Sequence, residues 1–580
     1  MQMLRRNIKT LTLFVALMAV VSVWAQDSVL VKEVTVSQEF NPTVNDAYKL
    51  GNTPTIDSPE PYTPSFEYSF FNAPLRTNYE IQFIGADEYF PSEERYDGDQ
   101  NYIMGGFGNY TTLFGELFYN AYNSENQTVN IFYRNRSSWG DVTLQDKEKV
   151  DAPLISNYGK VDFQRRYRYS VMNAAVSFDH KSYKFYGYHT LSDETSYSYL
   201  DDGSSVELES GKQALQTITV DFGLQSLQRR GSDFKYTLDF AFNSTSNDNR
   251  FAENQFDMIG ALEFDMGKFD VGVDINSNVG FYGKAADSLS RQFMGSTYYD
   301  IELSPYAAIR RENWDIKLGA KVEYYQMGSI QEPSLAPLLD LNFSLVPKYF
   351  TGFLTMTGDI KQNTFAQVVA DNPFIANDVD RKPTRTLYDV GGGLIGHPTK
   401  QLSMKLALNY QKLEDMLLYV NEFVTDDASV TNEEAYTNRF QAIYDDSKIW
   451  TFRGEVNYNT FAKWSVSAAF DYYNYTMINE FKPWNLPTFK ISAFAHYDVT
   501  EQIRVKGSFA YLPERAVKLP EDEVDYLPST YDMTLNGEYI FKDNISFFVD
   551  INNMLGSKYY DFNGYPAYRF NALVGATFRF

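Results

Sequence analysis

The last eleven residues of the chain, FNALVGATFRF, alternate between apolar and polar side chains up to the final residue, Phe580. A period of two predicts a β-strand with one face in an apolar medium and the other in a polar medium. Soluble domains usually end in a polar, frayed tail instead. The apolar face has Phe570, Ala572, Val574, Ala576, Phe578 and Phe580, and the polar face has Arg569, Asn571, Gly575, Thr577 and Arg579, with Leu573 the apolar exception.

The N-terminus indicates which medium the strand faces. Three basic residues within the first nine precede an apolar run from Leu11 to Ala25, and the small residues Val23 and Ala25 fit cleavage before Gln26. We therefore expect residues 1–25 to be a secretory signal peptide. A transmembrane anchor is the alternative, but it needs about 20 apolar residues and this run is shorter.

Composition narrows the class of the exported chain. The 580 residues carry a net charge of -24 and no cysteine, so disulfides, thiolate metal sites and cysteine nucleophiles are excluded. Removing the three positive charges of the signal peptide makes the mature chain more acidic still, which argues against a nucleic-acid partner. Tyr and Phe each occur 45 times, and no apolar run after residue 25 is long enough for a membrane-spanning helix. This profile is typical of a transmembrane β-barrel.

The same alternation recurs at 314–324, 402–410 and 545–551. A soluble β-sandwich also alternates, but its strands bury their apolar face in a core about 10 Å thick. Several hundred residues of continuous strands would need many such domains, and no linker divides the chain after about residue 100. We therefore expect a barrel in contact with outer-membrane lipid.

The spacing of turn signals predicts the size of the barrel. Nine short polar turns, expected on the periplasmic side, fall near HKSY, RRGSD, DMGKF, RREN, VPKY, HPTKQ, NTFAKW, DVTEQ and FKDN. Longer polar stretches, expected outside the cell, include 140–164, 366–384, 424–435 and 513–529. With further hairpins at NSENQ and GNYTT, the pattern predicts an all-β, antiparallel transmembrane barrel of about 22 strands, with a range of 18–22.

The signal-peptide pattern and the positions of the expected strands divide the chain into three parts. Residues 1–25 are the expected signal peptide, 26–100 a short and mostly extended periplasmic or luminal segment, and 101–580 the barrel in the cell outer membrane. The last strand must pair with the first, because an open edge in lipid leaves backbone groups unsatisfied. Phe570, Phe578 and Phe580 resemble the aromatic C-terminal signal that the barrel assembly machinery recognises in outer-membrane proteins.

The closing residues carry a resemblance to a known family. The stretch DINNMLGSKYYDFNGYPAYRFNALVGATFRF resembles the closing hairpin of TonB-dependent receptors. The matching residues are Asn553, Met554, Leu555, Lys558, Tyr559, Tyr560, Gly564, Tyr565, Pro566 and Phe580. Residues 38–56 and 106–116 resemble receptor-like barrels of Bacteroidota. The resemblance implies a Gram-negative outer-membrane protein that binds and takes up a ligand, with no identity implied for the ligand.

The N-terminal segment departs from the family pattern. Receptors of this class carry a plug of well over a hundred residues before the barrel, whereas residues 26–100 are few and rich in Pro, Asp and Glu. Within it, Glu33, Val34, Thr35 and Val36 resemble a TonB box, which would bind TonB by adding a β-strand to its sheet. An ordinary strand or tether is the alternative for these four residues.

Residues with catalytic or ligand-binding chemistry are few. The chain has four histidines, and only His189, near Ser192 and Asp193, is placed for an outer-membrane hydrolase. We find no nucleophile, metalloprotease or phosphate-binding motif, and we expect a non-enzyme without a cofactor. Acidic stretches such as TDDASVTNEE lack the spacing of a calcium loop, so no metal site is predicted.

Three functions stay open at this stage: an energised uptake receptor, an accessory or structural subunit of an outer-membrane complex, and a passive porin. Charged residues of both signs are expected to face the lumen, namely Asp315, Lys317, Lys321, Glu323, Arg504 and Lys506. Such a wall suits a polar insert or charges paired across water. We therefore expect part of 26–100 to enter the lumen or its periplasmic mouth, leaving 29–38 accessible to TonB or another periplasmic partner.

Overall fold

The computed structural model describes residues 101–580 except 146, 188–195, 199–204, 208–211, 228–233, 248–251, 283–296, 377–380, 424–435, 461–462 and 520–522. The predicted signal peptide, the segment 26–100 and the TonB-box-like Glu33–Val36 stretch lie outside the described residues. Within the described part, no helix has the length and hydrophobicity needed to cross a membrane.

Twenty-two strands form one sheet, in agreement with the predicted number. The strands are β1 (Tyr102–Gly108), β2 (Thr112–Ser124), β3 (Gln127–Ser138), β6 (Leu154–Arg166), β7 (Ser170–Lys184), β10 (Lys212–Ser226), β11 (Phe234–Asn247), β12 (Ala252–Asp265), β13 (Asp270–Tyr282), β14 (Thr297–Arg310), β15 (Trp314–Met327), β16 (Ile330–Val346), β17 (Phe350–Lys361), β18 (Thr384–Gly396), β19 (Leu402–Phe423), β20 (Tyr436–Asn459), β21 (Trp464–Met477), β22 (Phe489–Asp498), β23 (Ile503–Leu512), β26 (Thr530–Lys542), β27 (Ile545–Asn552) and β30 (Asn571–Arg579).

Each barrel strand pairs antiparallel with the next along the chain, and the last strand pairs with the first. The closing ladder runs from Tyr102 opposite Arg579 to Gly108 opposite Leu573. The sheet therefore has no free edge, as a membrane-spanning sheet requires. The terminal strand is structural to its end, because the Phe580 amide donates to the Asn101 carbonyl at 2.9 Å.

Side chains alternate between the outer wall and the lumen. On β14, Tyr299, Ile301 and Leu303 are exposed on the outer face, while Asp300 and Glu302 between them are buried inside. Exposed apolar side chains on every second position form the lipid-facing wall of a transmembrane barrel. The protein is thus an outer-membrane barrel, as the alternation predicts.

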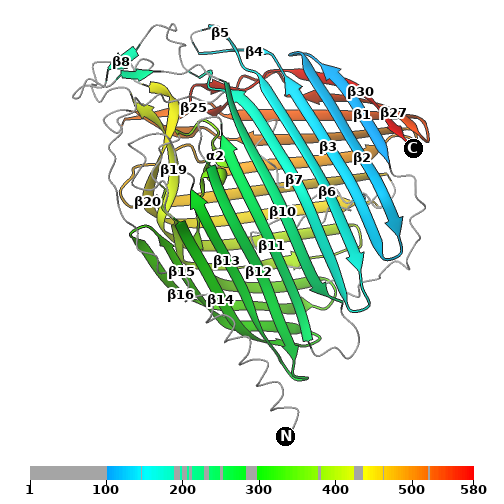
Figure 1. Cartoon of the computed structure of the whole chain (residues 1–580), viewed down its shortest axis with the longest axis vertical. Coiled ribbons are helices and arrows are strands. Elements are labelled where there is room, and N and C mark those ends of the chain that lie inside the picture. The colour runs from blue at the N-terminus through cyan, green and yellow to red at the C-terminus, as the bar shows by residue number, and fades with distance from the viewer. Residues whose placement is uncertain are drawn as a thin grey trace, which may run out of the picture. The chain divides into compact units, whose positions relative to one another are not determined.

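The two ends of the barrel differ in the length of their connections. Short turns join β2 to β3, β6 to β7 and β26 to β27 at the end that holds Asn101 and Phe580. The opposite end carries the hairpins β4 (Asp141–Thr143) with β5 (Lys149–Asp151), β8 (Ser196–Ser198) with β9 (Ser205–Glu207), β24 (Arg515–Lys518) with β25 (Val524–Leu527) and β28 (Tyr560–Phe562) with β29 (Tyr565–Pro566), and the helix α2 (Phe365–Asp371). In Figure 1 several of these elements gather toward the upper left. Short turns face the periplasm and long loops the exterior in such barrels.

Two of the predicted connections are wrong. HKSY is not a periplasmic turn, because His180 and Lys181 lie inside β7, toward its external end. The predicted external stretch 140–164 contains not only the β4–β5 hairpin but most of the barrel strand β6. In both places the strand carries polar residues on both faces where it leaves the lipid, so its composition is that of a turn. The stretch 424–435 lies outside the described residues.

The seam between β30 and β1 depends on glycine, which gives a testable prediction. A side chain at Gly575 would collide with the Gly105 carbonyl oxygen and with the ring of Phe548. We expect Gly575→Leu to lower the folded fraction several-fold, measured by heat-modifiable mobility in SDS gels. Gly115→Leu in β2 is the matched control, since an added Cβ there meets nothing within 4 Å. Equal folded fractions of the two variants would contradict this account of the seam.

Candidate functional site at the external mouth

Buried apolar residues from loops and strand ends meet in one cluster at the external end of the barrel, which we call the mouth core. Its members are Val142, Leu144, Val150, Ala152, Tyr183, Phe185, Tyr186, Tyr282, Tyr298, Tyr325, Met327, Ile360, Phe365, Val368, Val369, Phe374, Ile375, Phe440, Tyr565 and Tyr568. The β4–β5 loop follows the third strand of the barrel, whereas Tyr325 and Ile360 end the eleventh and thirteenth strands. The cluster therefore joins nearly opposite walls across the mouth.

The helix α2 brings the β17–β18 loop into this core. Thr364 caps the helix and forms a capping box with Gln367. The Glu253 carboxylate on β12 accepts from the amides of Phe365 at 3.3 Å and Ala366 at 2.9 Å. The caps satisfy amides that the first turn leaves free. The loop is thus anchored to a wall several strands away from its own.

Aromatic contacts join this loop to the far side of the barrel. The rings of Phe374 and Tyr565 stack with centroids 3.7 Å apart and planes 3° apart. Ile375 forms a β-bridge with Phe440 at the start of β20, and the Phe440 ring lies 5.4 Å from that of Phe562. These groups come from the β17–β18 loop, the β27–β30 loop and the start of β20, so the contacts hold three separate parts of the mouth core together.

The β27–β30 loop supplies the other half of the mouth core. Asn553 braces it by accepting from the Ser557 amide at 3.0 Å and donating to the Ser557 carbonyl at 2.8 Å. Tyr559 donates to the Asp532 carboxylate at 2.9 Å, and burial raises the pKa of its phenol far above the ordinary range. The phenol therefore stays neutral and a donor. Lys558 reaches the Leu144 carbonyl in the β4–β5 loop at 3.1 Å.

The residues of the family resemblance lie in this loop. Asn553, Lys558, Tyr559 and Tyr565 each make a contact that shapes the loop or ties it to a neighbour. Met554 and Leu555 are exposed at its outer edge. The residues that carry the resemblance thus form a structural unit of the mouth. The motif alone does not reveal this structural role.

Charged residues line the wall below the mouth core, as predicted for Asp315, Lys317, Lys321 and Glu323. Lys321 is only 3% exposed, and its Nζ lies 3.1 Å from Glu302 Oε2 and 2.5 Å from Asp359 Oδ1. Glu302 and Glu323 lie directly opposite each other on β14 and β15. Like charges in that position destabilise a sheet unless a counter-charge is present.

The carboxylates of Glu302, Glu323 and Asp359 each place an oxygen within 4.8 Å of the others, a spacing that could suit a metal ion. The Lys321 ammonium already supplies positive charge to Glu302 and Asp359. Glu323 accepts from the Ile360 amide at 3.1 Å. The arrangement is therefore an ion-paired network of the wall.

Removing the lysine tests this network. We expect Lys321→Gln to destabilise the barrel by about 3–5 kcal/mol, because buried carboxylates lose their counter-charge. Lys317→Gln is the control: Lys317 pairs with Asp274 at 2.7 Å but is 30% exposed, so screening limits its loss to about 1 kcal/mol or less. Urea unfolding in lipid vesicles measures both. Equal midpoints for the two variants would show that the network does not stabilise the wall.

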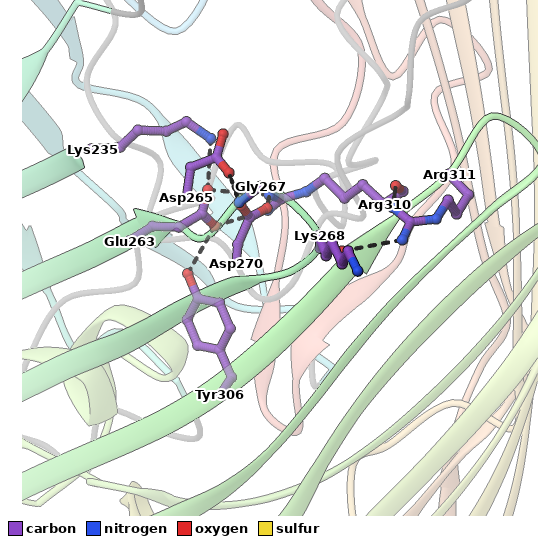
Figure 2. A network of polar contacts seen from close by, with 9 residues as sticks. All are labelled: Lys235, Glu263, Asp265, Gly267, Lys268, Asp270, Tyr306, Arg310 and Arg311. Carbon is purple, nitrogen blue, oxygen red and sulfur yellow. Dashed lines mark hydrogen bonds and ion pairs between the residues drawn. The ribbon is translucent and has the colours of Figure 1, made fainter. Parts of the chain in front are cut away.

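A second polar network lies on the wall at the periplasmic end (Figure 2). Glu263 on β12 pairs with Lys235 at 2.7 Å and with Arg310 at 2.8 Å, and Tyr306 donates to it at 3.1 Å. Arg310 also pairs with Asp270. Polar side chains thus line both ends of the lumen on this side of the barrel.

The remaining predicted site residues fall in three groups. Phe570, Phe578 and Phe580 are exposed on the outer wall, with the last two rings 5.9 Å apart. Glu33, Val34, Thr35 and Val36, together with the hydrolase candidates His189, Ser192 and Asp193, lie outside the described residues. Among the other histidines, His496 lies inside β22 at 3.2 Å from Asp498, and His397 lies in the β18–β19 turn.

The sequence reasoning missed the mouth core altogether. Glu253, Phe374 and Phe440 have no neighbours in the sequence that distinguish them from other wall or loop residues. Their role arises from contacts between connections more than sixty residues apart. No local pattern contains that information.

No family model and no curated protein matches the sequence. Solved structures match the fold. The FrpB iron transporter of Neisseria meningitidis aligns with a TM-score of 0.62 at 9% identity, covering 84% of this chain and 82% of that one. The ferric-catecholate import receptor Fiu of Escherichia coli aligns with 0.58 at 11% identity, covering 83% and 82%. FpvA of Pseudomonas aeruginosa aligns with 0.59 at 12% identity, covering 83% and 72%.

At these identities the likeness is one of fold. The chain forms a 22-strand barrel whose fold is like that of the FrpB iron transporter and the Fiu import receptor.

Proposed function

We propose that the protein is a receptor-like outer-membrane barrel that binds a ligand outside the cell and takes it up through a mouth that is closed at rest. The neighbours of like fold include transporters and import receptors. A fold hosts many functions, so the proposal rests on the mouth as well as on the likeness.

The mouth core is the observation that carries the proposal. A passive porin needs a lumen that stays open to water and solutes. Here loops from nearly opposite walls pack their aromatic side chains into one buried cluster. A wide barrel closed by folded loops suits a gated receptor better than an open pore.

Binding to TonB, which would energise the uptake, provides the experiment that tests this proposal. In the mature chain, Glu33, Val34, Thr35 and Val36 would bind the periplasmic domain of TonB by adding a strand to its sheet. We expect Val34→Pro/Val36→Pro to weaken that binding at least tenfold in calorimetry, because proline cannot donate a ladder hydrogen bond. Ala47→Pro, outside the stretch, is the control and should bind like the wild type.

Two results would overturn the proposal. Equal affinities of the wild type and the double proline variant mean that the stretch is a tether. Absence of any TonB binding by the full mature chain favours an accessory subunit of an outer-membrane complex.

A further inference from the structure

A group of exposed cations lies on the β6–β7 turn at the periplasmic end. Arg165, Arg166 and Arg168 are all exposed, and in the described part of the chain none forms an ion pair with a carboxylate. Arg165 and Arg168 instead lie over the rings of Tyr167 and Tyr169, at 5.1 and 5.2 Å. We call Arg165, Arg166 and Arg168 the basic turn.

Other cations at this end differ in how they are paired. Lys235 and Arg310 hold Glu263 in the network of Figure 2. Arg311 donates to the carbonyls of Arg310 and Lys268, at 2.9 and 3.2 Å, and the Lys268 side chain is exposed. The basic turn thus brings three exposed arginines together within four residues, in a chain whose net charge is -24.

The most acidic part of the N-terminal segment directly precedes the barrel. Residues 87–99, within ADEYFPSEERYDGDQ, hold six carboxylates and one arginine. The whole segment 26–100 holds fourteen carboxylates and four cationic side chains. Opposite charges of this density attract across the periplasmic face and select one orientation over others.

The acidic residues 87–99 are long enough as an extended stretch to reach the basic turn. The segment joins the barrel at Asn101, which lies beside Phe580 at the periplasmic end. From β1 to β7 there are four steps between paired strands, β1 to β2, β2 to β3, β3 to β6 and β6 to β7. At about 4.8 Å a step this is roughly 20 Å. A thirteen-residue stretch spans up to about 43 Å when extended, so it reaches the turn.

We propose that residues 87–99 bind the basic turn, Arg165, Arg166 and Arg168, and so hold the N-terminal segment against the periplasmic rim of the barrel. Arginine suits this role because its planar guanidinium binds carboxylates through two hydrogen bonds. The inference does not depend on TonB binding or on ligand uptake.

Cysteine cross-linking of the full mature chain tests it, because the native chain has no cysteine. Ser92→Cys is paired with Ser170→Cys beside the basic turn or, as control, with Asn544→Cys in the β26–β27 turn. Asn544 lies two strand steps from β1, on the side away from the basic turn, whereas Ser170 lies four steps away. Random tethering therefore favours Asn544, whereas binding favours Ser170.

In vesicles of neutral lipid at low salt, we expect at least fivefold more cross-linking with a short bis-maleimide at Ser170 than at Asn544. The excess should vanish in 1 M NaCl, because salt screens exposed charges. Arg165→Glu/Arg166→Glu/Arg168→Glu should abolish the excess. Adding Glu93→Lys/Glu94→Lys/Asp97→Lys to that variant should restore it.

Heat-modifiable mobility in SDS gels confirms that each variant is folded. Equal cross-linking at the two positions, or an excess that persists in the charge-reversed variant, overturns the proposal. So does an excess that is lost when phosphatidylglycerol is added to the vesicles, since the basic turn then binds lipid headgroups in preference to the segment.

Discussion

Replacing Phe374 with aspartate is expected to open the external mouth of the barrel. Phe374 is 1% exposed and stacks on Tyr565, and its ring also lies 5.8 Å from those of Phe185 and Phe562. Truncating a buried phenylalanine costs about 3–5 kcal/mol, and an unpaired buried carboxylate costs more. Since the barrel wall does not depend on this contact, the loss should separate the loops while the strands stay paired. Planar-bilayer recordings should then show steady conductance.

Phe481→Asp is the matched control for this change. Phe481 lies in the external β21–β22 connection and is 68% exposed, so the same substitution removes no buried contact there. It should leave the barrel as closed as the wild type. If Phe374→Asp folds, as judged by heat-modifiable mobility, and still does not conduct, the mouth core is not the barrier.

Replacing Phe580 with aspartate is expected to lower the yield of assembled barrel several-fold. Phe580 is 44% exposed on the outer wall at the periplasmic end. Even a strongly disfavoured charge costs only about 0–1 kcal/mol near the membrane interface, so the loss of stability should be small. The larger effect should come from the aromatic ending, which resembles the signal read by the assembly machinery.

This yield is measured as the amount of heat-modifiable protein in outer-membrane fractions. Phe481→Asp serves again as control, because it places the same charge in an external loop. The barrel that does assemble from Phe580→Asp should unfold at the wild-type urea midpoint. Equal yields of the two variants would contradict a role for the terminal aromatic ring in assembly.

The barrel could be predicted from the sequence because lipid acts on every strand in the same way. Ile301 and Leu303 face lipid, with Glu302 between them facing the lumen, and this local rule repeats along the strand. The rule fails where strands leave the lipid. At His180 and Lys181 both faces of β7 meet polar surroundings. The strand therefore continues through residues whose composition is typical of a turn.

The mouth core could not be predicted because its contacts are distant in the sequence. Phe374 and Tyr565 are separated by most of the second half of the chain, and only closure of the barrel brings their loops together. The family resemblance singled out Tyr565 but not its partner. Likewise, Lys321 was expected in the lumen, but its pairing with Asp359 across β16 depends on the register of three strands.

Single-channel conductance of the full mature chain, beside a version lacking residues 26–100, tests the central claim most directly. If the mouth core closes this 22-strand barrel, both proteins should insert without steady conductance, and only Phe374→Asp should open. Steady conductance of the full chain would contradict the account and indicate a porin. Conductance that begins on removing 26–100 alone would show that the segment, and not the loops, is the barrier.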